Sequence, residues 1–260
     1  MKNLLLPILA IAALPLIPTD AAAQFYVVAD DGSVLYRMES GTPAYVTFEN
    51  PNPYNGTVGT AVDLGLPSGT LWADHNIGAT NPEDYGDYYS WGETATKETY
   101  DWSTYFDTND GGQTFGKYNN DDGKTELETS DDVASQTWGG KWQMPTQAMI
   151  QELISQCYWV WTTTYNGKSV SGYIVYKAKT DSDYDVATDP HIFLPAAGGR
   201  WGSELDNAGD DGYYWSRSLD PDDSGYACSL GFGSDYVWDD NASRRFSGFA
   251  VRPVVLPAAE

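Results

Sequence analysis

Apolar residues recur at helical spacing in one stretch of the chain and form short alternating runs almost everywhere else. After Thr146, the residues Ile150, Leu153, Ile154 and Cys157 fall three or four positions apart. This spacing places four apolar side chains on one face of a helix, and threonine is a residue that caps helix N-termini. We therefore predict a helix that begins after Thr146 and packs this face into the core.

A shorter helix is predicted over residues 131–137. Acidic residues stand at its start, where negative charge suits the positive end of the helix dipole. Gly139 and Gly140 follow it, and glycine is the residue that most often ends a helix.

Downstream of these helices, short strand-like runs are separated by turn residues. The runs are "YWVWTTTYNG", "SGYIVYKA", "HIFLPAAG", "YYWSRSL", "YACSLGF" and "FAVRPVVL". Two helices followed by many short strands and long loops are typical of the α+β class. In the last run, strand alternation puts Phe249 and Val251 on the core face and Ala250 and Arg252 on the opposite face.

Residues 24–60 differ from the rest of the chain. "FYVVADDGSVLYRM" and "AYVTF" read as short strands, and Asp31-Gly32 is suited to a tight hairpin turn. "ENPNPYNGTVG" then carries the prolines and glycines of irregular structure. We predict a small N-terminal β-hairpin appendage and linker over residues 24–60, and one larger domain over residues 61–257.

The first 23 residues have the pattern of a secretory signal peptide. Lys2 supplies positive charge, residues 4–17 are apolar, and three alanines at 21–23 fit the rule for cleavage after small residues. The apolar run is shorter than the roughly 20 residues that a membrane span needs, and no later segment is apolar enough to span. The sequence predicts a protein exported to the periplasm, the cell surface or the medium, without membrane insertion.

The charge balance excludes some classes of partner. Asp and Glu number 37 against 14 Lys and Arg, which gives a net charge of −23. Such a chain repels nucleic-acid phosphates and anionic lipid surfaces. Its 10 tryptophans and 19 tyrosines supply the large buried areas of a folded domain. The oligomeric state is left open.

Few residues are suited to catalysis or to metal binding through nitrogen and sulfur. His75 and His191 are the only histidines. The sequence therefore gives little support to a metal centre built from histidines or to a Ser-His-Asp catalytic arrangement. Cys157 and Cys228 are the only cysteines. They are either bridged, as an oxidising compartment allows, or two small buried residues.

Five motifs occur in an order that resembles one bacterial family. They are "VDLGLPSGTLWADHNIGATNPEDYGDYYSWGET", "WGGKWQMPTQAMIQELISQCYWVWT", "IFLPAAGGR", "DGYYWSRSL" and "GFAVRPV". Over residues 61–256 the chain is similar to the Fibrobacter succinogenes major paralogous domain family of secreted proteins. The resemblance implies a C-type-lectin-like domain with two helices, a compact mixed sheet, long loops and neighbouring chain ends.

The same resemblance extends to the sulfatase-modifying, formylglycine-generating enzymes, which need two reactive cysteines close together near the C-terminal end. Here Cys157 precedes Cys228 by 71 positions, so that feature is missing. We therefore predict a protein that is not an enzyme, and keep a formylglycine-generating type as the least favoured alternative.

The glycines and tryptophans of these motifs are expected to have structural roles. Glycines at tight turns or close backbone contacts are predicted at Gly65, Gly69, Gly78, Gly139, Gly140, Gly198 and Gly199. Core packing is predicted for Trp72, Trp91, Trp138 and Trp142.

Calcium is left open as a cofactor, and no other is predicted. "NPEDYGDYY", "NNDDGK", "DPDDSG" and "WDDNAS" are rich in the oxygen ligands that calcium prefers. "VWDDNAS" partly matches the Trp-Asn-Asp element of sugar-binding C-type lectins. However, an Asp replaces the first Asn, and the Glu-Pro-Asn type of partner loop is missing.

The stretch "DYVWDDNAS" at residues 235–243 is predicted to be a recognition loop ahead of the last strand. Aromatic side chains mixed with small polar ones are typical of adaptable binding surfaces. The alternative is that these rings belong to the core. The candidate ligand-binding residues are Trp201, Arg217, Tyr236, Trp238, Asp239, Asp240 and Asn241.

We therefore expect a secreted, non-catalytic binding module that recognises a glycan or a protein ligand through loops near the C-terminal strand. The alternative from a different class is a structural or interaction subunit of the bacterial cell surface. In that reading, the appendage over residues 24–60 is the point of attachment.

Overall fold

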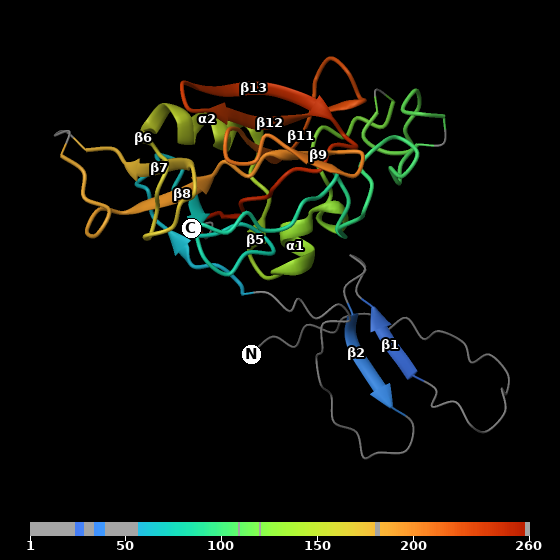
Figure 1. The fold of residues 1–260 in the computed structure, drawn as a ribbon. Coiled ribbons are helices and arrows are strands. Elements are labelled where there is room, and N and C mark those ends of the chain that lie inside the picture. The colour runs from blue at the N-terminus through green and yellow to red at the C-terminus, as the bar shows by residue number, and fades with distance from the viewer. Residues whose placement is uncertain are drawn as a thin grey trace, which may run out of the picture. The chain divides into compact units, whose positions relative to one another are not determined.

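The structure is a computed structural model of the chain. It describes residues 57–257 except 109, 120 and 180–182, and the backbone of strands β1 (Gln24–Val28) and β2 (Val34–Glu39) (Figure 1). The signal peptide predicted over residues 1–23, the Asp31-Gly32 turn and the strand "AYVTF" lie outside the described residues.

The chain divides into two compact units, Met1–Pro51 and Asn52–Glu260. In the first unit, β1 and β2 pair antiparallel, with an irregularity between Val27 and Val28. The two strands predicted within "FYVVADDGSVLYRM" are thus confirmed. The boundary between the units falls inside the 24–60 stretch that the sequence assigns to appendage and linker.

The second unit contains two α-helices and many short strands, joined by long loops (Figure 1). Its elements are β3 (Ala61–Val62), β4 (Leu71–Ala73), a 3-10 turn (Thr129–Asp131), α1 (Val133–Thr137), β5 (Trp142–Gln143), α2 (Gln147–Gln156), β6 (Cys157–Thr162), β7 (Gly172–Lys177), β8 (His191–Pro195), β9 (Gly199–Trp201), β10 (Glu204–Asp206), β11 (Gly212–Leu219), β12 (Tyr226–Gly233), β13 (Tyr236–Arg244) and β14 (Val254–Val255). The sheets have the strand orders β3-β4-β14-β5, β6-β7-β8, β11-β12-β13 and β9-β10. In these four sheets the neighbouring strands run antiparallel, which agrees with an α+β class that is mostly sheet.

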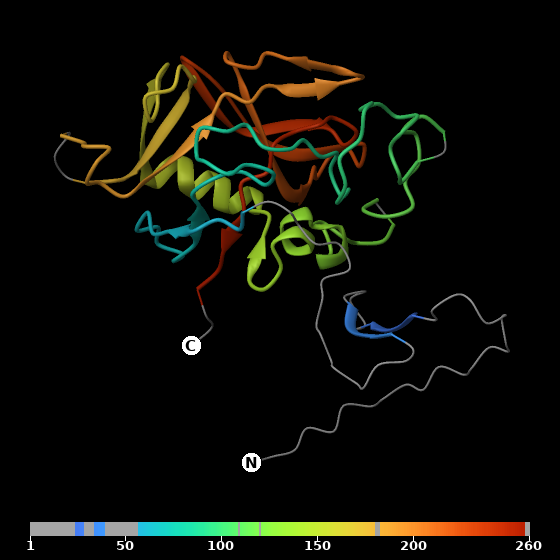
Figure 2. The same ribbon diagram turned by 60° about the horizontal axis from the view of Figure 1, so that its bottom comes forward.

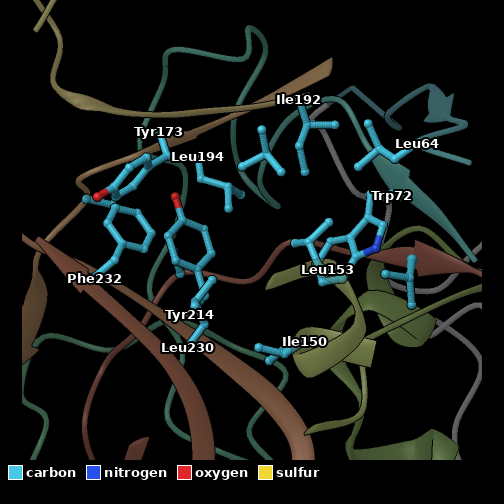
Figure 3. Close-up of a cluster of buried hydrophobic side chains, with 14 of the residues drawn as sticks. Leu64, Trp72, Ile150, Leu153, Tyr173, Ile192, Leu194, Tyr214, Leu230 and Phe232 are labelled. Atoms are coloured by element: carbon cyan, nitrogen blue, oxygen red, sulfur yellow. The ribbon is translucent and has the colours of Figure 1, made fainter. Parts of the chain in front are cut away.

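Helix α2 forms where the sequence predicts it. The Thr146 hydroxyl accepts a hydrogen bond from the Met149 amide at 3.2 Å and caps the first turn. Ile150 and Leu153 are fully buried. Figure 3 shows both side chains pointing from α2 into a cluster that includes Trp72 of β4. The predicted helix is therefore confirmed, with Ile150 and Leu153 in the core. Ile154 is only partly buried, and Cys157 lies beyond the helix, as the partly buried first residue of β6.

Helix α1 begins at Val133, two residues later than predicted, because Asp132 serves as its cap. The Asp132 carboxylate accepts hydrogen bonds from the amides of Ser135 at 3.0 Å and Met144 at 2.9 Å. It is completely buried, and this burial raises the pKa of the Asp132 carboxyl. The cap thus joins α1 to β5 as well as starting the helix.

The predicted core tryptophans are confirmed. The exposed fractions of Trp72, Trp91, Trp138 and Trp142 are at most 9%. They belong to two clusters, one around α2 with β4, β7 and β8, and one around α1 with β5 and the loops after β4. No helix in the described ranges combines the length and apolar character that crossing a bilayer demands.

The closing segment of the second unit runs through its middle. Residues 245–255 are eleven consecutive buried residues. β14 lies between β4 and β5, and Figure 2 shows this red segment passing between the cyan strands and the green strand. Just before it, the Ile77 amide donates to the Val251 carbonyl, and the Trp215 amide donates to the Ala250 carbonyl.

Burial on both sides corrects one prediction. Phe249 and Val251 are buried as predicted, but Ala250 and Arg252 are buried too. Alternation of exposed and buried residues needs one solvent-facing side, and a segment enclosed on both sides has none.

Arg252 is the centre of a buried hydrogen-bond network. Its guanidinium donates to the Asn76 side-chain oxygen at 2.8 Å and to the carbonyls of Phe193 at 2.8 Å and Ala73 at 3.1 Å. Burial lowers the pKa of Arg252 to about 10, which leaves it charged at neutral pH. One side chain therefore connects β4, the loop after it, β8 and the closing segment.

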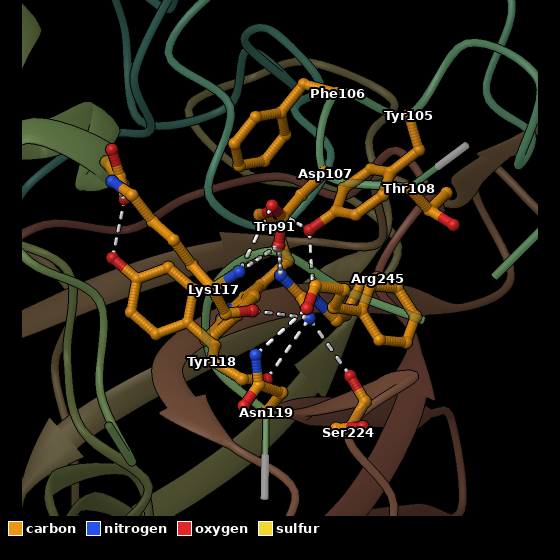
Figure 4. Close-up of polar contacts among 12 residues, drawn as sticks. Trp91, Tyr105, Phe106, Asp107, Thr108, Lys117, Tyr118, Asn119, Ser224 and Arg245 are labelled. Atoms are coloured by element: carbon orange, nitrogen blue, oxygen red, sulfur yellow. Dashed lines mark hydrogen bonds and ion pairs between the residues drawn. The ribbon is translucent and has the colours of Figure 1, made fainter. Parts of the chain in front are cut away.

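Arg245, at the other end of the closing segment, makes a second such network (Figure 4). It donates to the Tyr105 hydroxyl at 2.8 Å, the Asp107 carboxylate at 3.0 Å and the Ser224 carbonyl at 3.0 Å. Its fully buried guanidinium also lies close to the rings of Trp91, Tyr105, Phe115 and Tyr118. Arg245 therefore anchors the long loop between β4 and α1.

Gly198 and Gly199, at the start of β9, permit two close contacts. Gly198 has φ of +64°, and a Cβ there would lie 2.2 Å from the Asp206 carbonyl oxygen. A Cβ on Gly199 would lie 2.6 Å from the Trp201 ring and 2.9 Å from Phe249. The predicted need for glycine at both positions is confirmed.

Candidate functional site

The predicted recognition loop is a strand. β13 (Tyr236–Arg244) pairs with β12, and residues 234 and 235 form the turn. Glycines on β12 leave room for the aromatic rings of β13: Gly231 lies opposite Trp238, and a Cβ on Gly233 would lie 2.5 Å from the Tyr236 ring. The loop prediction was wrong. The acidic residues of this stretch suggested a loop, although its aromatic residues at alternate positions fit a strand that pairs with the glycine-containing strand β12.

The pairing of β12 with β13 contains a bulge. Ser229 pairs with Asn241 and Gly231 pairs with Trp238, so β13 advances three residues where β12 advances two. The extra residue lies among Asp239 and Asp240, and such bulges redirect side chains and twist a hairpin. The side chains of Asp239, Asp240 and Asn241 lie outside the described part of the chain.

Tyr236 and Trp238 form a stacked aromatic pair on one face of the hairpin, as residues two apart in a strand do. Their ring centroids lie 4.3 Å apart at an interplanar angle of 28°. Trp238 remains 50% exposed. A large ring with half its surface in water is therefore held in place by its neighbour.

Asp211 fixes the orientation of this pair. The Tyr236 hydroxyl donates to Asp211 Oδ1 at 2.8 Å, and the Tyr213 hydroxyl donates to Asp211 Oδ2 at 3.2 Å. Burial and the Asp211 carboxylate raise the pKa of Tyr236 above its ordinary value, so the hydroxyl remains a donor at neutral pH. We call Asp211, Tyr213, Tyr236 and Trp238 the hairpin patch.

Trp201 adjoins the hairpin patch. Its ring meets Tyr213 edge to face with centroids 5.6 Å apart, and meets Phe249 at the same distance. Because it is partly buried, Trp201 both supports the closing segment and borders the patch.

Arg217 is not brought to the hairpin patch. It lies four residues beyond Tyr213 along β11, a separation of about 13 Å at the usual strand rise. Its guanidinium donates to the Gln143 side chain at 2.7 Å and to the Leu127 carbonyl, and lies 3.7 Å from the Asp132 carboxylate. Arg217, on β11, therefore holds both β5 and the loop that precedes α1 in place.

Asp211 and Tyr213 are the patch residues that are absent from the predicted set. Asp211 stands two positions before Tyr213 in "DGYYWSRSL", so strand alternation places both side chains on one face. That alternation was the available signal. The pairing with Tyr236, 25 positions later, needs the register of the three-stranded sheet.

The oxygen-rich stretches stabilise turns in the described structure. Asp84 accepts from the Asn81 amide at 2.9 Å, Asp122 from the Lys124 amide at 2.9 Å, and Asp220 from the Asp223 amide at 2.8 Å. These bonds between carboxylates and backbone amides two or three positions away replace the missing ladder bonds of long loops. Within the described ranges, no three Asp, Glu, His or Cys side chains form a group that could hold a metal ion.

Both histidines are engaged in structural contacts. His75 is buried, with Nδ1 at 2.7 Å from Asp74 Oδ1 and Nε2 at 3.0 Å from the Thr57 carbonyl. His191 has Nε2 at 2.9 Å from the Tyr165 hydroxyl and Nδ1 at 2.8 Å from the Asp189 carbonyl. Both nitrogens of each ring thus take part in hydrogen bonds that hold neighbouring segments together.

The two cysteines are free thiols on different sheets, Cys157 at the start of β6 and Cys228 on β12. The bridged alternative is therefore not found in the structure. Cys228 Sγ points to the Leu219 carbonyl at 3.5 Å.

Both thiols are expected to react slowly with iodoacetamide in the folded protein at mildly alkaline pH. Burial raises the pKa of Cys157 to about 12 and that of Cys228 to about 11, so little reactive thiolate is present. Mass spectrometry after timed labelling measures this, with urea-unfolded protein as the control. Rapid labelling of the folded protein, or thiols that stay unlabelled in urea, would contradict it.

Comparison of this chain with protein-family models, with curated proteins and with solved structures gave no significant match.

Proposed function

We propose that this protein is a secreted, non-catalytic binding module that recognises a glycan or a protein ligand through the hairpin patch. The observation that carries the proposal is the half-exposed Trp238, stacked on Tyr236 and oriented through Asp211. Burying such a ring releases much apolar surface from water. Little side-chain entropy is lost on binding, because the ring is already ordered.

The patch also offers polar groups beside its aromatic surface. Each oxygen of the Asp211 carboxylate already accepts one hydroxyl, and a carboxylate oxygen has capacity for a second donor. A ring face next to a fixed carboxylate suits a ligand that is apolar on one side and donates hydrogen bonds on the other. Sugars and tyrosine- or arginine-containing protein surfaces both have this character.

A C-type-lectin-like fold is part of the same proposal. It is supported by the pairing of the closing strand β14 with β4, which places the last strand of the second unit beside one of its first strands. The two helices α1 and α2 and the long loops between β4 and α1 also agree with the expected likeness to the Fibrobacter succinogenes major paralogous domain family.

The alternative of a structural subunit at the cell surface is favoured by a different observation. β1 and β2 lie in a compact unit of their own, as an attachment element would. A formylglycine-generating activity receives less support, because Cys157 and Cys228 lie on strands of different sheets.

Replacing Trp238 with alanine is expected to weaken ligand binding by at least about 2 kcal/mol, the size of an aromatic hot spot. Its free energy of unfolding should change by less than about 0.5 kcal/mol, as for a surface position. The ligand is first sought with the mature chain on glycan and protein arrays, and then titrated against wild type and variant.

Tyr158→Ala is the matched control, because Tyr158 is an aromatic residue 44% exposed on β6, outside the patch. It should leave binding unchanged. A Trp238 variant that loses about 3–5 kcal/mol of stability, as a core truncation does, would place Trp238 in the core and remove the proposal.

A further inference from the structure

A cavity of about 400 Å³ opens among the loops between β4 and α1. It is lined by residues 92–97, Phe106, Ser130 and Asp131, and none of the hairpin patch residues contributes to it. Its volume lies in the range of small-molecule sites in proteins, about 300–1,000 Å³. It is therefore a concave surface separate from the hairpin patch.

The charges in and around the cavity are balanced within the protein. Lys97 Nζ lies 2.8 Å from the Glu93 carboxylate, and both side chains are less than one-fifth exposed. The Asp131 carboxylate has its own cation, Lys117, at 2.8 Å. A charged ligand would meet no unpaired charge of opposite sign here. The free-energy cost of removing its charge from water would therefore not be offset by an ion pair. The cavity therefore favours an uncharged ligand.

The cavity wall offers hydrogen-bonding groups of both kinds. Thr94 and Thr96 belong to its lining, and their hydroxyls have no hydrogen-bond partner among the described residues. Glu93 Oε2 faces only Lys97, and Asp131 Oδ1 accepts only from the Ser130 hydroxyl among the described residues, so each of these oxygens can accept one further donor. Such a wall suits a ligand that both donates and accepts, as hydroxyl groups do.

Phe106 gives the cavity one apolar side. Its ring is 50% exposed, and in Figure 4 it lies on the opposite side of Asp107 from Arg245. The Phe106 amide donates to Glu93 Oε1 at 3.1 Å, and Lys97 Nζ donates to the Thr104 carbonyl at 3.2 Å. The ring and the polar wall are thus fixed relative to each other before any ligand arrives.

We propose that this cavity is a second ligand site that holds one uncharged sugar ring. The C–H face of the sugar lies on Phe106. Its hydroxyls bond to the Glu93 and Asp131 carboxylates and to the threonine hydroxyls. This combination of an aromatic face, neutralised carboxylates and free hydroxyls matches an uncharged polyhydroxylated ring more fully than it matches an ion or a purely apolar molecule.

The test uses the mature protein with D-glucose, D-galactose and D-mannose as probes, observed by saturation-transfer NMR and calorimetric titration. At least one neutral sugar should bind. Its amino and uronic-acid counterparts should bind at least about fivefold more weakly, because a charge gains no partner in the cavity. Comparing that sugar with its disaccharide distinguishes a free monosaccharide from the end of a longer glycan.

Two variants locate the binding. Phe106→Ala should weaken it at least about fivefold, as for an aromatic contact. Thr94→Val keeps the shape of the side chain and removes only the hydroxyl. It should weaken binding about three- to tenfold, the range for one hydrogen bond, with an unchanged melting temperature. Trp238→Ala and Tyr158→Ala should have no effect on the sugar.

Three outcomes would overturn the proposal. They are no binding by any of the neutral sugars, equal or tighter binding of a charged counterpart, and a loss of binding caused by Trp238→Ala instead of Phe106→Ala. The last outcome would assign the sugar to the hairpin patch and leave the proposed function intact. Sugar binding that survives Trp238→Ala leaves the hairpin patch to be tested by its own ligand.

Discussion

Replacing Arg252 with methionine is expected to lower the free energy of unfolding by about 3–5 kcal/mol. The substitution leaves the Asn76 side-chain oxygen and the carbonyls of Phe193 and Ala73 buried without their donor. Each buried acceptor left unsatisfied costs about 1–3 kcal/mol, and the methionine recovers only part of this by apolar packing. Urea denaturation followed by tryptophan fluorescence measures the loss.

Arg244→Met is the matched control. Arg244 is exposed, and among the described side chains it makes one hydrogen bond, to the Tyr226 hydroxyl at 3.3 Å. Its replacement should change stability by less than about 0.5 kcal/mol, as at other surface positions. Equal effects of the two variants would mean that the Arg252 network contributes no more than a surface contact.

Replacing Arg245 with methionine is the second change with a large expected effect, again about 3–5 kcal/mol, because it breaks a buried ion pair. The Asp107 carboxylate, only 10% exposed, loses its cation, and the Tyr105 hydroxyl loses its donor. Unlike the Arg252 variant, this one should first loosen the loop that contains residues 105–119. Hydrogen exchange resolved by mass spectrometry should show this loop exchanging faster than α2.

Asp107→Asn separates charge from hydrogen bonding at this site. The amide oxygen still accepts from Arg245, so the loss of stability should be smaller than for Arg245→Met. Uniform protection of residues 105–119 in the Arg245 variant would show that aromatic packing alone holds the loop.

Features that depend on local sequence were predicted well. Helix α2 follows from the spacing of Ile150 and Leu153 and from the Thr146 cap, all within one stretch of chain. The close contacts at Gly198 and Gly199 also act over a few residues, apart from the Phe249 ring. In these cases the physical cause and its effect are near each other in sequence.

Features that depend on long-range pairing were predicted less well. Alternation placed Arg252 on the face opposite the core, and its burial could not be predicted because its acceptors lie 59 to 179 positions away. Arg217 was grouped with Trp238 because the two are close in sequence, but the three-stranded sheet separates them. Tyr236 and Trp238 were both among the predicted site residues, and their role in binding stays a prediction. Their stacking and their carboxylate partner Asp211 follow only from the register of the sheet.

The central position of the closing segment has a consequence for the order of folding. Ala73 is synthesised early, but the donor of the hydrogen bond to its carbonyl, Arg252, follows it by 179 positions. This bond can form only after Arg252 has been synthesised. Contacts of such high sequence separation slow folding, because the entropy cost of closing a long loop comes before the contact can stabilise the closed form. A nascent chain that has not yet reached residue 245 lacks the centre of its core. Folding of the second unit is therefore a late event, completed after nearly the whole unit has been translated.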